Sequence, residues 1–202
     1  MQFDPNIHKR RSIRLRNYDY SQAGLYFITI CCHNRQPLFG KIVDGGILHN
    51  AAGITVIKIW NEMAERFKNI QLHESVVMPN HFHGIIEIAD GYVGAPLVGA
   101  QKIDDVKSNF AHTLNRAPTR GAPTGATNHK TIGNVVGAFK SLTTNAYIHG
   151  VKNENWPPFN KYLWQRNYYE HVIRNELAYL KISEYIQTNP ARRLEDTYYC
   201  ND

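Results

Sequence analysis

Residues 76–88, VVMPNHFHGIIEI, decide how the rest of the sequence is interpreted. One apolar run ends in a Met-Pro-Asn break, and a second apolar run begins at His81. Because proline and asparagine favour turns and proline is unfavourable in a central strand, the stretch predicts a strand, a tight connection and a second strand. Residues two apart on a strand point to the same face, so His81 and His83 are expected side by side.

Two neutral imidazoles on a rigid strand can hold a divalent metal ion. The pattern is short, and taken alone it more often marks two polar residues that are satisfied by backbone groups or water. The metal interpretation of His81 and His83 therefore depends on what the rest of the chain places beside them.

The charge of the chain favours an anionic partner. The 202 residues carry a formal net charge of +6, and such a balance favours nucleic acid, although an ordinary basic enzyme would have the same charge. A basic arm with Arg10, Arg11, Arg14 and Arg16 precedes the first predicted strand. It could lie along a phosphate backbone, and a solvated terminus explains it equally well.

The cysteines and the apolar runs indicate the compartment. The three cysteines follow neither a disulfide framework nor a zinc-ligand spacing. The N-terminal residues lack an apolar signal core, and no run reaches transmembrane length. These features predict a cytoplasmic protein that does not contact a membrane.

Hydrophobic periodicity and turn residues predict the order of the elements. Strands are predicted at 25–32, at 70–77, from His81 onward and at 161–166, helices at 50–67, 131–149 and 176–188, and a small hairpin within 39–48. This order is that of a ferredoxin-like α+β fold, with an antiparallel sheet, helices on one face and an added C-terminal helix. The first helix is expected to bury the stripe Ile54, Ile57, Trp60 and Ala64.

Residues 91–130 differ in composition from the rest of the chain. Gly, Ala, Pro and Thr dominate there, and such a segment cannot bury much apolar surface. We expect one domain, 1–202, with a flexible insertion at about 91–130 that holds at most a short helix at 103–114.

The last predicted helix carries a second polar pair. Tyr185 and Asn189 are four residues apart, so they share one face of this helix. Pro190 disfavours the helical region for the residue before it, and the helix should therefore end close to Asn189.

Three stretches together carry a resemblance to a known family. MPNHFHGIIEI, LWQRNYYEHVIRN and EYIQTNP occur in this order. Over about residues 10–193 the sequence resembles the REP-associated tyrosine transposases, a group of the single-tyrosine HUH transposases of insertion sequences. The resemblance implies a nuclease and strand transferase for single-stranded DNA, in which a tyrosine forms a 5′-phosphotyrosine bond and releases a 3′-hydroxyl.

The resemblance also implies the roles of individual residues. Tyr185 matches the nucleophile, and His81, His83 and Asn189 match the ligands of one divalent ion, Mg²⁺ or Mn²⁺. Related transposases more often carry glutamine at the position of Asn189, so a weaker or different contact there stays open. Glu87 lies on the histidine face, but about 13 Å along the strand from His83, and is left out of the metal site.

Other tyrosines are weaker candidates for the nucleophile. Tyr168 and Tyr169 lie in an aromatic, strand-like segment, where packing is the favoured role. Tyr179 lies on the last helix, but Ser183 rather than an amide follows four residues later.

The expected partner is single-stranded or hairpin DNA. Candidates for contacting it are Arg10, Arg11, Arg14, Arg16, Lys140, Gln165 and Arg166. Contacts to the DNA backbone would make the affinity depend on salt, whereas a preference for one sequence would require contacts to bases.

Two other functions remain open at this point. A non-cleaving DNA-hairpin binding protein derived from a transposase would have the same charge and aromatic content. A metallohydrolase of small phosphoesters is less favoured, because no carboxylate cluster completes a two-metal site. The sequence does not decide between a monomer and a homodimer.

Overall fold

The computed structural model describes residues 18–89 and 131–192. In chain order its elements are β1 (Gly24–Cys31), the short 3-10 helix η1 (His33–Arg35), β2 (Gly40–Val43), β3 (Gly46–His49), α1 (Ala51–Asn61), α2 (Met63–Arg66), β4 (Ile70–Val77), β5 (His81–Ile88), α4 (Ile132–Asn153), β6 (Tyr169–Ile173) and α5 (Glu176–Thr188). The predicted basic arm and the predicted insertion at 91–130, with its short helix, lie outside the described residues.

Four strands form one antiparallel sheet in the order β4-β5-β1-β6. Together with the alternation of strands and helices along the chain, this order gives the ferredoxin-like arrangement. The predicted α+β class is therefore confirmed. β2 and β3 form a separate hairpin, where a small hairpin was predicted.

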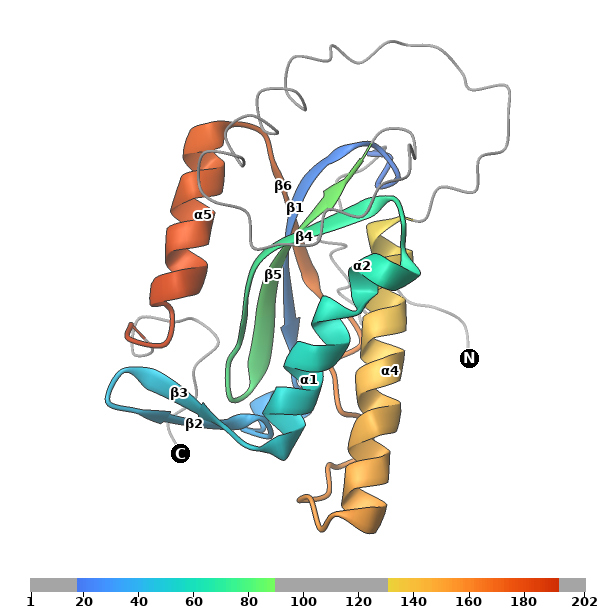
Figure 1. The fold of residues 1–202 in the computed structure, drawn as a ribbon, viewed down its shortest axis with the longest axis vertical. Coiled ribbons are helices and arrows are strands. Elements are labelled where there is room, and N and C mark those ends of the chain that lie inside the picture. The colour runs from blue at the N-terminus through green and yellow to red at the C-terminus, as the bar shows by residue number, and fades with distance from the viewer. Residues whose placement is uncertain (1–17, 90–130, 193–202) are drawn as a thin grey trace, which may run out of the picture.

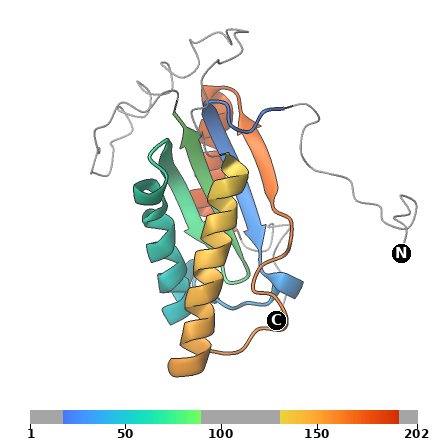
Figure 2. The ribbon, with the colours of Figure 1, turned by 90° about the vertical axis from the view of Figure 1, so that its right-hand side faces the viewer.

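Helices cover the sheet on both faces. Figure 1 and the turned view in Figure 2 show α1 and α4 on one face and α5 on the other. Along β1, Tyr26, Ile28 and Ile30 belong to the core under α1 and α4, whereas Leu25 and Phe27 belong to the core under α5. A strand covered on both faces has a continuous apolar sequence, which explains the run at 25–32.

Aromatic rings fill the larger core. The ring of Trp60 lies 4.6 Å from that of Phe82 and 5.3 Å from that of Phe139, measured between centroids. Gly84 makes room for this contact, because a Cβ atom there would lie 2.8 Å from the indole of Trp60. Small and large residues thus interlock between β5 and α1.

The predicted helix at 50–67 is interrupted at Glu62, and its buried face differs from the predicted stripe. Ile54 is 60% exposed, so its assignment to the core is wrong. The side chain of Asn50 caps the helix, and Gly53 lies against the carbonyl of Phe39, where a side chain has no room. This contact turns a neighbouring face inward, with Ala52, Gly53, Val56 and Trp60 buried.

The predicted strand at 161–166 is also wrong, because the last strand of the sheet lies at Tyr169–Ile173. Within 161–166 only Trp164 forms a β-bridge, to Cys32. The indole of Trp164 is buried and donates a hydrogen bond to Thr143 at 2.8 Å, so its burial serves the core rather than a strand ladder. Lys161 has a φ of 61°, which no regular strand accepts.

The other two helices follow the predictions. α4 begins after a capping box at Thr131 and continues past residue 149 to Asn153. α5 has the predicted bounds, and the side chain of Asn175 caps it by accepting a hydrogen bond from the backbone of Ala178. Among the described residues, no helix combines the length and the apolar character that crossing a bilayer requires.

Candidate functional site

The two histidines of β5 lie next to each other beneath α5. Their rings are 4.6 Å apart between centroids, and both residues are buried. Phe82, between them, points to the opposite face and joins the core under α1 and α4. The alternation expected from the sequence therefore presents His81 and His83 together on one face of the sheet.

Each imidazole is held through its Nδ1 atom. Nδ1 of His81 lies 2.7 Å from Oδ1 of Asn80, and Nδ1 of His83 lies 2.8 Å from the hydroxyl of Thr29 on β1. Phe27 stacks on the ring of His83, with the centroids 5.4 Å apart. Such partners fix the orientation of an imidazole and leave Nε2 as the nitrogen that can bind a ligand.

The environment of the histidines favours neutral rings. Burial lowers the pKa of His81 to about 3, and the positive charge of Arg35 acts in the same direction. Burial, and then the neighbouring His81, lower the pKa of His83 well below its ordinary value. Only the neutral imidazole can bind a metal ion, so both residues are in the form that ligation requires.

Tyr185 on α5 reaches this pair. Its hydroxyl lies 3.3 Å from Nε2 of His83, and its ring makes edge contacts with His83 and with Phe27. The residue is 37% exposed, so its side chain lies between the buried histidines and solvent. The sequence pattern that singled out Tyr185 thus corresponds to a direct contact with His83.

Asn189 lies one helical turn beyond Tyr185. It is the C-cap residue of α5 and keeps helical backbone angles. Because Tyr179 contacts the end of β5 through His73 and Tyr185 contacts His83 near its start, α5 runs antiparallel to β5. The last turn of α5, which contains Asn189, therefore lies toward the His81 end of β5. The side chain is buried, and its Oδ1 atom accepts no hydrogen bond from the described residues.

The candidate metal ligands, His81, His83 and Asn189, are all neutral. Within 18–89 and 131–192, no group of three or more His, Cys, Asp or Glu side chains is placed to hold a metal ion. His81, His83 and Asn189 instead offer two imidazole nitrogens and one amide oxygen that lacks a partner. This set fits one exchangeable divalent ion whose other positions are filled by water or phosphate oxygens.

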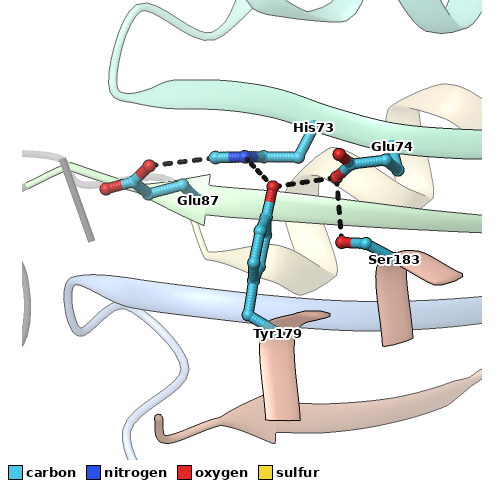
Figure 3. A network of polar contacts seen from close by, with 5 residues as sticks. All are labelled: His73, Glu74, Glu87, Tyr179 and Ser183. Atoms are coloured by element: carbon cyan, nitrogen blue, oxygen red, sulfur yellow. Dashed lines mark hydrogen bonds and ion pairs between the residues drawn. The ribbon is translucent and has the colours of Figure 1, made fainter. Parts of the chain in front are cut away.

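A polar network holds the first half of α5 against the sheet, as Figure 3 shows. The hydroxyl of Tyr179 donates to Oε2 of Glu74 at 2.9 Å and lies 3.2 Å from Nδ1 of His73. Nε2 of His73 lies 3.0 Å from Oε2 of Glu87, and the hydroxyl of Ser183 also donates to Glu74. Glu87 is thus engaged at the far end of β5, away from the histidine pair.

This network was not predicted, because its two β4 members, His73 and Glu74, are adjacent in the chain. A β-bulge between Leu72 and Ser75 interrupts the alternation of β4. As a result His73 and Glu74 both reach α5, although adjacent strand residues ordinarily point to opposite faces. Thr29 was also missed, because only its register opposite His83 reveals its role.

The predicted DNA contacts have different environments. The ammonium group of Lys140 donates to the backbone carbonyls of Gln165, Arg166 and Asn167, and burial lowers its pKa to about 8. The side chain of Gln165 donates to the carbonyl of Cys32, whereas Arg166 is exposed. Within the described residues, Lys140 and Gln165 therefore hold a turn together, and Arg166 faces solvent.

The four arginines of the basic arm, Arg10, Arg11, Arg14 and Arg16, lie outside the described residues. Tyr168 packs against the core, as expected. Tyr169 contacts Phe27 but is 37% exposed, so packing is only part of its role.

The chain was compared with known proteins by sequence and by structure. No protein-family model matches it. A Haemophilus influenzae protein described as uncharacterized is 38% identical over 200 residues, which cover 98% of this chain and 97% of the relative. A solved structure of a REP-associated tyrosine transposase bound to a REP hairpin is similar with a TM-score of 0.50 and 17% identity. That match covers 89% of this chain and 73% of the solved one.

Proposed function

The chain belongs to the same family as the Haemophilus influenzae protein and has the fold of a REP-associated tyrosine transposase, and on this basis we propose that it cleaves and rejoins single-stranded DNA. In this proposal Tyr185 is the nucleophile, and the DNA carries a hairpin like the one bound to the solved transposase. A shared fold does not by itself imply a shared reaction, so the proposal rests on the site.

The observation that carries the proposal is the contact between Tyr185 and His83, one of the two paired histidines. A hydroxyl 3.3 Å from Nε2 of His83 lies where a phosphate bound at the histidines would meet it. Tyr185 is partly exposed, so a DNA strand can approach its side chain from outside. The packing tyrosines Tyr26 and Tyr179 are buried and lack this access.

The reaction would be a transesterification at a phosphodiester of the DNA. The Tyr185 oxygen attacks phosphorus, a bond to the tyrosine forms, and the bond to the 3′-oxygen of the preceding nucleotide breaks. The tyrosine hydroxyl loses one proton and the released 3′-oxygen gains one, so the step consumes and releases no net proton. Because the phosphotyrosine bond retains the energy of the broken bond, a 3′-hydroxyl can reverse the step and join a new strand.

His81, His83 and Asn189 would hold one divalent ion, Mg²⁺ or Mn²⁺. When bound, such an ion offsets the negative charge that develops on the phosphate oxygens. All three ligands are neutral, so they leave the full charge of the ion available to the phosphate. In this role the Nδ1–H groups of His81 and His83 donate to Oδ1 of Asn80 and to the hydroxyl of Thr29, and these hydrogen bonds hold the rings in orientation.

The proposal is tested by trapping the covalent intermediate. Wild-type protein incubated with a labelled hairpin oligonucleotide and Mn²⁺ or Mg²⁺ should give an adduct that survives denaturing electrophoresis. Tyr185→Phe should bind the oligonucleotide and give no adduct, whereas Tyr162→Phe, which changes an exposed tyrosine elsewhere, should behave as wild type.

The other outcomes separate the competing functions. Tight binding of the hairpin by wild-type protein without an adduct, under any divalent ion, would favour a non-cleaving DNA-hairpin binding protein. Cleavage that persists in Tyr185→Phe would show that another group attacks the phosphate.

A further inference from the structure

α5 covers only part of the sheet face that carries His83. Tyr179 and Ser183 attach it to β4 through Glu74. β6 is the outermost strand on the other side of the sheet. Between β6 and the start of α5 lies a hollow of about 500 Å³, whose lining includes Tyr20, Tyr169, Glu170, His171, Arg174 and Ala178.

The hollow is connected to the candidate site through Phe27. The rings of Tyr169 and Phe27 meet edge to face, with centroids 6.4 Å apart. Phe27 in turn stacks on His83 and makes an edge contact with Tyr185 at 6.3 Å. Two aromatic side chains, Tyr169 and Phe27, therefore connect the hollow to His83 and Tyr185.

The hollow is lined by aromatic rings, one cation, Arg174, and one carboxylate, Glu170. Glu170 is buried and alternates with Tyr169 and His171, so it belongs to the opposite face of β6. Tyr169 is 37% exposed although it contacts the core, so part of its ring faces outward. Tyr169 and His171 are two apart on β6 and share a face, and Arg174 follows them as an exposed cation. Arg174 lies five residues from Tyr169, about 16 Å along the strand. An exposed aromatic ring suits an unpaired base, and a cation at the other end of the hollow suits a phosphate farther along the same DNA strand.

We propose that this hollow binds one unpaired base of the DNA strand that enters the site. Tyr169 provides the stacking surface, and Arg174 contacts a phosphate farther along the same strand. The inference rests on the proposed function for the identity of its ligand. A base in a duplex is stacked on both faces and cannot lie on Tyr169, so the hollow selects the single-stranded part of the substrate rather than the hairpin stem.

The edge of β6 could also accept an extended peptide, as exposed sheet edges do in other proteins. A peptide would be held mainly through backbone hydrogen bonds, for which neither an exposed ring nor Arg174 is needed. The side chains therefore favour the nucleic acid.

The test measures binding without divalent ions, so that no cleavage interferes. Two hairpin oligonucleotides carry a short single-stranded extension on the 5′ or the 3′ side, with the fluorescent base 2-aminopurine at successive positions. One extension should show quenching at one position when wild-type protein binds. Tyr169→Ala should abolish this quenching and weaken binding about 5- to 150-fold, whereas Tyr169→Phe should retain both.

Arg174→Ala tests the phosphate contact. It should weaken binding of the same oligonucleotide and lower the salt slope by about 0.7, the value for one phosphate of a single strand. Tyr162→Ala and Lys58→Ala, which remove an exposed tyrosine and an exposed cation elsewhere, should bind as wild type does. A blunt hairpin without an extension should not distinguish any of these variants.

Each outcome bears on the proposal separately from the adduct experiment. Quenching that depends on Tyr169 supports the base site even if Tyr185 forms no adduct. Wild-type binding by Tyr169→Ala, or equal affinity for blunt and extended hairpins, overturns the base site even if the adduct forms. Loss of quenching in Tyr169→Phe as well as Tyr169→Ala would mean that the ring does not stack on a base, and would also overturn it.

Discussion

Replacing Tyr179 by phenylalanine removes one hydroxyl and keeps a buried ring. The hydroxyl donates to Glu74 at 2.9 Å and lies 3.2 Å from Nδ1 of His73. A hydrogen bond to a charged group contributes about 1.5–3 kcal/mol. Glu74 is only half-buried and keeps its hydrogen bond from Ser183, so we expect a smaller loss, about 1–2 kcal/mol of unfolding free energy.

Urea unfolding monitored by circular dichroism measures this loss. With an unchanged slope, the midpoint should fall by about 0.5–1 M. Tyr162→Phe is the matched control, because its ring is 63% exposed, and its midpoint should not move. Ser183→Ala should cost less than Tyr179→Phe, and the double variant should lose more than either, because both hydroxyls bind the same carboxylate.

A midpoint for Tyr179→Phe equal to that of Tyr162→Phe would refute the reasoning. It would mean that solvent replaces the lost hydrogen bond without cost and that the network of Figure 3 does not stabilise the attachment of α5. A changed slope would instead indicate that the variant alters the folded or unfolded ensemble rather than a single contact.

Three further outcomes are expected. Thr29→Val should weaken Mn²⁺ binding about 10- to 100-fold in isothermal titration, because it removes the hydrogen bond that orients His83; unchanged affinity would contradict this role. Lys140→Ala should lower the unfolding free energy by about 1–3 kcal/mol, because three carbonyls lose their donor, whereas Lys152→Ala on the exposed end of α4 should not. Burial raises the pKa of Tyr147 to about 12, so the folded state keeps a proton that the unfolded chain loses near pH 10. The stability from this group is complete below pH 10 and is lost as the pH rises toward 12, and Tyr147→Phe should flatten the fall in midpoint over that interval.

The sequence predicted best those elements whose ends are set by local chemistry. α5 has the predicted bounds because Asn175 caps its start and Pro190 follows its last turn. The pairing of His81 with His83 depends only on the two-residue period of a strand. These features need no knowledge of which segment packs on which.

The errors arose where distant residues decide the structure. The aromatic segment at 161–166 has the composition of a strand, but Lys140 binds the carbonyls at its end and Thr143 binds the indole of Trp164. Ile54 fits an apolar stripe, yet the contact of Gly53 with the hairpin turns it outward. In both places a tertiary contact overrides the local preference.

The bulge in β4 makes the attachment of α5 depend on the number of residues in this strand. Two residues, His73 and Glu74, lie opposite the single residue Ile85 of β5, so β4 contains one residue more than a regular ladder would need. A deletion of either residue would restore regular pairing without moving the flanking pairs, and the sheet itself should tolerate it. Only one side chain would then face α5 at this level, and the helix that carries Tyr185 would lose either its carboxylate partner or its imidazole partner. A relative with a β4 one residue shorter must therefore attach this helix to the sheet in a different way.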